Sequence, residues 1–159
     1  MQITIVCVGK VKEQFYRDAC AEYAKRLSRY CKFNIIEVAD EMTPDNASDV
    51  QVQAILKKEG DRILAKIPDG AHVFTLEIKG RRYSSEALAG RIKDITVAGK
   101  SHIVFVIGGS LGLHADVTAK ADEHLSFSDM TFPHQLMRVI LAEQIYRCFR
   151  INNNEPYHK

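Results

Sequence analysis

HIVFVIGGSLG, residues 102–112, is a run of apolar and mostly β-branched residues that stops at a pair of glycines. A short apolar run that ends at glycine is typical of a strand buried on both faces. Residues 3–8, ITIVCV, have the same character and end at Gly9. Strands buried on both faces are the rule in parallel sheets, which are covered by helices on either side.

Working outward from these two runs, strands alternate with helices along the whole chain. Further strands are predicted at 33–38, 71–78 and 124–127, and amphipathic helices at 12–31, 48–67, 85–98, 114–122 and 133–152. Ser48 is placed to cap the second of these helices, and Ser84 or Ser85 the third. This order predicts an α/β fold with a mostly parallel sheet flanked by helices, in a single domain over residues 1–159.

The composition excludes several classes of protein. Of 159 residues, 46% are apolar and 26% are charged, as in an ordinary soluble domain. No apolar run is long enough for a membrane span, and the N-terminus has no signal-peptide pattern, so we expect a cytoplasmic protein without membrane contact. The four cysteines have no C-x-x-C spacing and are expected to be buried and apolar in character, and no metal site is predicted.

The net charge of +2 is too small to indicate a nucleic-acid-binding protein, but the charge is unevenly distributed. Residues 1–31 carry six basic and three acidic groups, and residues 79–100 carry six and two. If these basic segments converge in space, they form a phosphate-binding face. On charge alone, scattered solvated helix faces explain them equally well.

The loop GGSLG, residues 108–112, follows a predicted strand, where ligands of open α/β sheets bind. Glycines there let backbone N–H groups approach a ligand, but a tight turn explains them as well. The spacing is not G-x-G-x-x-G, which disfavours a Rossmann-like nucleotide site. Gly99-Lys100-Ser101 is not a P-loop, because Asp94 stands where that motif needs glycine.

The predicted helix at 133–152 is apolar on two sides. The sheet can cover one side; a second copy of the chain, or another element of one larger core, must cover the other. His134 and Arg138 lie one turn apart at the start of this helix, where they can bind an anion or remain solvated. The two apolar sides are formed by Met137, Leu141, Ile145 and Cys148, and by Leu136, Val139, Ile140 and Tyr146.

Three segments together closely resemble the RlmH-type ribosomal RNA methyltransferases of the SPOUT class. They are GGSLG after a strand, FSDMTFPHQLMRVILAEQIYR at 127–147, and the terminal PYHK, with VGK at 8–10 and TLEIKG at 75–80 in support. The resemblance covers the whole chain. It implies a trefoil knot near the C-terminus, a homodimer through the last helix, and S-adenosylmethionine as methyl donor. The implied reaction is methylation of N3 of a pseudouridine in 23S-type ribosomal RNA on the assembled ribosome.

By resemblance, the cofactor lies among three loops. Apolar side chains there suit an adenine ring, and the glycines allow close backbone contacts. The residues expected to bind the cofactor are Leu76, Gly108, Gly109, Phe127, Ser128, Asp129, Met130, Thr131 and Phe132.

The acceptor N3 of pseudouridine carries a proton at neutral pH, so a group must take that proton or favour the anion. His134, Glu143 and His158 are candidates for acid–base catalysis, and Arg138 is a candidate for stabilising negative charge on the base. The residues alone do not choose among them.

The tail after the last helix has two interpretations. It is a frayed terminus, or Tyr157 stacks on a base while His158, Lys159 and Arg138 contact the substrate. In a dimer, the tail of one protomer can reach the cofactor of the other. Because the tail adds little apolar burial, we expect it to contribute little to folding. The alternative function is a non-enzymatic ribosome-binding or assembly module on the same fold.

Overall fold

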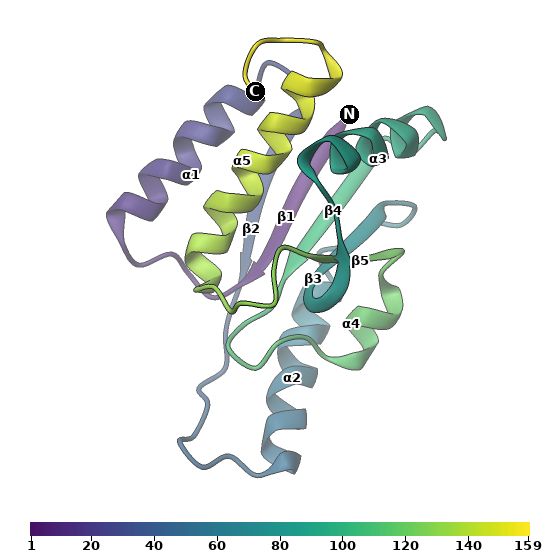
Figure 1. The fold of residues 1–159 in the computed structure, drawn as a ribbon. Helices are drawn as coiled ribbons and strands as arrows, with labels where there is room; N and C mark the ends of the chain where they lie inside the picture. The colour runs from purple at the N-terminus through teal and green to yellow at the C-terminus, as the bar shows by residue number, and fades with distance from the viewer.

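The structure, a computed structural model, describes all of residues 1–159 and contains one five-stranded parallel sheet (Figure 1). The strand order is β2-β1-β4-β3-β5, and every neighbouring pair is parallel. The α/β fold with a mostly parallel sheet is therefore confirmed. The strands are β1 (Gln2–Val8), β2 (Lys32–Val38), β3 (His72–Arg82), β4 (His102–Ile107) and β5 (Glu123–Ser126).

The apolar runs that predicted buried strands lie at the centre of this sheet. In β1 and β4, alternate residues enter two different cores. Ile3 and Ile5 pack in a cluster of 20 buried residues on one face, and Val6 packs in a cluster of eight on the other. A strand with both faces covered has no solvated positions, which explains why its sequence shows no alternation.

The helices divide unequally between the two faces (Figure 1). The helix α5 packs against both α1 and α3 over the larger core, while α2 and α4 contact each other over the smaller one. None of the helices combines the length and hydropathy needed to cross a membrane. Their bounds are α1 (Gln14–Leu27), α2 (Asp49–Leu64), α3 (Ser85–Val97), α4 (Ala115–Lys120) and α5 (His134–Asn152).

Local signals confirm several predicted features. Ser48 caps α2 in a capping box with Gln51, and Ser84 caps α3. All four cysteines are free and buried, and burial raises the pKa of Cys7 to about 12. That thiol stays protonated, as expected of a side chain that packs in the core.

Two predicted elements have wrong bounds. The first helix is shorter than 12–31 at both ends. The guanidinium of Arg17 binds the carbonyl oxygens of Val11 and Lys12 and holds the segment before α1 outside the helix. After Leu27 the chain turns, and the N–H groups of Tyr30 and Cys31 both donate to the carbonyl oxygen of Leu27. The third strand does not stop at residue 78 but continues to Arg82, pairing with β5 again after a shift in register. The trefoil knot stays a prediction.

Candidate active site

A cavity of about 910 Å³ lies at the carboxyl ends of β3, β4 and β5, beside the start of α5. Its volume is in the range of sites that hold a small organic ligand. Residues 76–79 of β3, the loops at 108–113 and 127–133, and the first turn of α5 form its walls, and half of the 20 lining residues are hydrophobic. Eight of the nine residues predicted to bind a cofactor line it: Leu76, Gly108, Gly109, Phe127, Ser128, Met130, Thr131 and Phe132.

The ninth predicted residue, Asp129, points elsewhere. Its side chain is 80% exposed and forms an ion pair with Arg82 in the extension of β3. This pair joins the loop before α5 to the strand that the sequence predicted to end earlier. Asp129 therefore does not line the cavity, and its part in cofactor binding stays a prediction.

The glycine loop approaches itself closely at one position. A Cβ atom on Gly108 would lie 2.5 Å from the carbonyl oxygen of Gly112, far inside van der Waals contact. The N–H of Gly112 donates to the carbonyl of Gly109 at 3.1 Å and closes the loop. The N–H of Ser110 donates to no group of the chain and so remains free for a ligand. Glycine at 108 is thus required by a tight turn that also borders the cavity.

The loop before α5 combines apolar cover with free backbone donors. Phe127 and Phe132 pack against the larger core, while Met130 is 73% exposed. The hydroxyl of Ser128 accepts a hydrogen bond from the N–H of Met130 at 3.1 Å. The N–H groups of Thr131 and Phe132 have no acceptor within the chain. A ligand with an apolar ring and hydrogen-bonding edges matches these walls.

His134 lies at the start of α5 and lines the cavity. Burial lowers the pKa of its imidazole, the nearby guanidinium of Arg138 lowers it further, and Asp40 opposes both. His134 is therefore mainly neutral at pH 7, the form that accepts a proton. Of the three acid–base candidates, it is the one that faces this cavity in a single chain.

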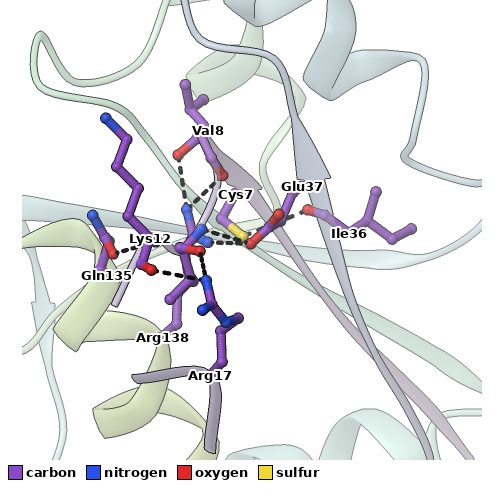
Figure 2. Close-up of polar contacts among 10 residues, drawn as sticks. Cys7, Val8, Lys12, Arg17, Ile36, Glu37, Gln135 and Arg138 are labelled. Atoms are coloured by element: carbon purple, nitrogen blue, oxygen red, sulfur yellow. Dashed lines mark hydrogen bonds and ion pairs between the residues drawn. The ribbon is translucent and has the colours of Figure 1, made fainter. Parts of the chain in front are cut away.

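Arg138 lies elsewhere, fully buried beside the carboxyl ends of β1 and β2 (Figure 2). Its guanidinium donates to Oε1 of Glu37 at 2.8 Å, to the carbonyl of Val8 at 2.9 Å and to that of Gly9 at 2.8 Å. These contacts within the chain argue against the predicted direct contact with a substrate base. Helical spacing placed Arg138 next to His134 but did not reveal the partners that two distant strands supply.

The tail folds back onto α5 and α3. The hydroxyl of Tyr157 donates to Oε1 of Glu143 at 3.1 Å, and its ring packs edge-on against Tyr146. The guanidinium of Arg147 lies 4.7 Å from the centre of the Tyr157 ring, and His158 pairs with Glu86 at 2.7 Å. The tail is therefore ordered against α5 and α3 in the single chain, while its contribution to folding stays a prediction.

The predicted catalytic residues consequently lie in three places. His134 lines the cavity, and Arg138 is buried beside the ends of β1 and β2. Glu143 and His158 both contact Arg147 near the tail, with Lys159 exposed beyond them. Nine residues separate His134 from Glu143, which corresponds to about 13 Å along a helix axis. The roles of Glu143, Tyr157, His158 and Lys159 toward a substrate stay predictions.

Two acidic residues near the cavity, Glu77 and Glu59, were not among the predicted site residues. Glu77 lines it and binds His124 and Thr75, in a cluster whose Thr75–Glu77 hydrogen bond is 2.6 Å. Glu59 in α2 is only 5% exposed, and its Oε1 accepts from the N–H of Glu41 at 3.0 Å. Its other oxygen lies 3.3 Å from where a Cβ of Gly109 would stand, so Glu59 supports the glycine loop from the opposite side. A glutamate in an amphipathic helix is normally exposed to solvent, so nothing in the sequence around Glu59 indicates that its side chain is buried.

Glu59→Gln should stabilise the protein at neutral pH, because it keeps the acceptor oxygen and removes a buried charge beside two other acidic residues. Burial raises the pKa of Glu59 in the folded protein above its value in the unfolded chain. As the pH rises from the unfolded-state pKa to the folded-state pKa, the carboxyl group ionises more easily in the unfolded chain, so the wild type loses stability. We expect a gain of about 1 kcal/mol at pH 7.5, or about 2–4 °C in Tm, that disappears near pH 4. Calorimetric melting at both pH values checks this, with the exposed Glu22→Gln as control. An unchanged or lower Tm at pH 7.5 would contradict it.

With this geometry established, comparisons with known proteins give the family. Residues 1–158 match the family described as "Predicted SPOUT methyltransferase". The chain belongs to this family. Two relatives are similar over their full lengths, each match covering 100% of both chains. They are named ribosomal RNA large subunit methyltransferase H, from Bifidobacterium adolescentis with 58% identity and from Clostridium novyi with 57%.

A solved structure also shares the fold of this SPOUT methyltransferase. It is described as a probable methylase family protein from Haemophilus influenzae, with a TM-score of 0.50 and 13% identity. The match covers 96% of the present chain and 66% of the other. At this identity the likeness concerns the fold alone.

Proposed function

We propose that this SPOUT methyltransferase transfers a methyl group from S-adenosylmethionine to N3 of a pseudouridine in large-subunit ribosomal RNA, on the assembled ribosome in the cytoplasm. The observation that carries the proposal is the cavity itself, in which eight residues expected to bind the cofactor meet. The full-length relatives named as ribosomal RNA large subunit methyltransferases support the choice of substrate.

The residues of the cavity fit S-adenosylmethionine. Leu76, Phe127 and Phe132 offer apolar surface to the adenine, and the glycine loop allows a backbone approach. The free N–H groups of Ser110 and Thr131 are donors for polar edges of the cofactor. When bound, the cofactor supplies a reactive methyl group on a sulfonium.

The protein then has to align the acceptor and remove a proton. N3 of the pseudouridine would give its proton to the neutral imidazole of His134. The electron pair left on N3 would bond to the methyl carbon as the carbon–sulfur bond of the sulfonium breaks, which leaves the cofactor as an uncharged thioether. The base reaches this position at the mouth of the cavity, beside the first turn of α5. A neutral His134 at pH 7 suits this step, because an imidazolium has no free electron pair.

The active form in this proposal is a homodimer through α5. Leu136, Val139 and Ile140 are half-buried in the single chain, so a partner can cover them. The tail of one protomer then serves the substrate of its partner, with Tyr157 stacking on a base and His158 and Lys159 contacting RNA.

The test uses ribosomes from cells that lack this protein. Purified protein, labelled S-adenosylmethionine and a chelator are added to ribosomes or to protein-free large-subunit RNA, and nucleosides are identified by mass spectrometry. One methylated pseudouridine on ribosomes, with little on free RNA, is the expected result. Ribosome binding without cofactor binding in calorimetry would favour the non-enzymatic assembly module instead. Equal methylation of free RNA would refute the ribosomal substrate.

Deleting Tyr157–Lys159 should impair both stability and activity. The loss of the Tyr157 contacts should cost about 2 kcal/mol, or about 4–8 °C in Tm. Methyl transfer to ribosomes should fall at least about tenfold. Lys159→Ala, which removes an exposed charge, should leave Tm unchanged and lower only the transfer to ribosomes. A truncated protein with wild-type Tm would show that the Tyr157 contacts do not stabilise the fold, and full activity would remove the tail from the substrate site.

A further inference from the structure

Arg138 joins parts of the chain that lie far apart in sequence (Figure 2). It is on α5, yet it donates to carbonyl oxygens of Val8 and Gly9 and to Glu37 at the end of β2. The same Oε1 of Glu37 accepts the N–H of Val11 at 3.0 Å. The N–H of Lys12 donates to the side chain of Gln135 at 3.1 Å. The segment after β1 is therefore held against the first turn of α5 by several bonds at once.

The imidazole of His134 lies beside Gly9, the residue that follows β1. Gly9 has a φ of +82°, which few residues other than glycine adopt. A Cβ atom on Gly9 would lie 3.9 Å from Nε2 of His134 and 3.8 Å from Cγ of Asp40. The imidazole and the carboxylate of Asp40 therefore both border the space that a side chain at position 9 would fill. The hydrogen bond from Arg138 to the carbonyl oxygen of Gly9 holds this glycine in place.

We propose that Arg138, with Glu37, is a positioning residue that holds the Gly9 segment and thereby fixes the imidazole of His134 at the edge of the cavity. Arg138 acts through His134 and does not touch the substrate. Only the expected effect of Arg138 on methyl transfer rests on the proposed function. The placement of His134 can be measured without activity.

The charges around His134 give the expected direction. Asp40 faces the imidazole from the segment after β2, and Arg138 lies one turn along α5 with Glu37 behind it. The segment after β1 carries two basic residues, Lys10 and Lys12, and the N–H of Lys12 donates to the side chain of Gln135. Burial and Arg138 both lower the pKa of His134. Removing the guanidinium should therefore raise the pKa of His134 toward its ordinary value. A neighbouring positive charge is lost, and the imidazole becomes less firmly held and more accessible to water.

The experiment follows the imidazole signal of His134 by NMR during a pH titration, assigned by its absence in His134→Asn. Arg138→Met should raise the pKa of His134 and move the acid side of the pH–rate profile by the same amount. The kcat for methyl transfer to ribosomes should fall at least about tenfold at pH 7, with cofactor affinity changed less than about threefold. Ile95→Ala, a buried substitution in α3 far from the cavity, is the control for lost stability alone.

Two further variants keep the test decisive if Arg138→Met does not fold. Arg138→Lys retains the charge but not the paired N–H donors, and Glu37→Gln retains the acceptor oxygen but not the charge. In a His134→Asn background, Arg138→Lys should cost no further activity. An unmoved His134 titration, or an equal loss of kcat in that background, overturns the proposal. If the wild type transfers no methyl group, the proposed function fails, and the NMR titration still decides the positioning.

Discussion

Gly108→Ala should weaken the binding of S-adenosylmethionine at least about a hundredfold, equivalent to about 2.7 kcal/mol. The added methyl group would stand 2.5 Å from the carbonyl oxygen of Gly112 and 2.8 Å from its carbonyl carbon. Both atoms belong to the backbone, so the loop itself must move, and the cavity wall moves with it. Calorimetry of cofactor binding measures the effect, after circular dichroism has shown that the variant is folded.

Gly90→Ala is the matched control for this experiment. Gly90 lies in α3, and nothing stands within 4 Å of the position of its Cβ atom. This substitution should leave cofactor binding unchanged and raise stability by about 0.5–1 kcal/mol. If Gly108→Ala binds the cofactor as tightly as the wild type, the glycine loop is not part of the cofactor site.

Ile140→Asp should separate the proposed dimer and abolish methyl transfer. Ile140 is half-buried on α5 and joins Leu136 and Val139 on the part of the helix that the chain covers incompletely. An unpaired carboxylate in a buried interface costs about 3–5 kcal/mol, which weakens association at least about a hundredfold. Sedimentation at micromolar concentration should then show a monomer that remains helical by circular dichroism.

Val50→Asp provides the comparison, because Val50 is 80% exposed at the start of α2, on the other face of the sheet. It should remain dimeric and active. A wild-type protein that sediments as a monomer at the same concentration would refute the dimer. An Ile140→Asp protein that stays dimeric would move the interface away from this face.

Sequence reasoning found the elements of the fold because their signals are local. The apolar runs at β1 and β4, the serine caps and the alternation of elements each depend on a few neighbouring residues. The strand order is not local, since a parallel sheet with long crossovers accepts many orders from the same elements. The continuation of β3 past Gly80 was missed for the same reason, because its pairing depends on β5 more than 40 residues later.

The same distinction between local and distant contacts separates the site residues that were predicted from those that were not. Residues in the glycine loop and in the segment before α5 were predicted from the resemblance to the family, and eight of the nine predicted cofactor residues line one cavity. The position of Glu59 and the partners of Arg138 were not predicted, because both environments come from elements distant in sequence. A helical wheel predicts which side of α5 Arg138 occupies, but not that β1 and β2 end there with two carbonyl groups and a carboxylate.

The central position of β1 has a consequence for how the protein is made. Gln2 pairs with His102, so the backbone groups along one edge of β1 stay unpaired until a strand 100 residues later has been synthesised. At about 5–20 residues per second, that interval is about 5–20 s. Meanwhile the open edge of an apolar strand can pair with other chains. The last helix, α5, must then dock between α1 and α3 before the cavity is complete. The central place of β1 in the sheet thus leaves the nascent chain open to wrong pairing until β4 has been made.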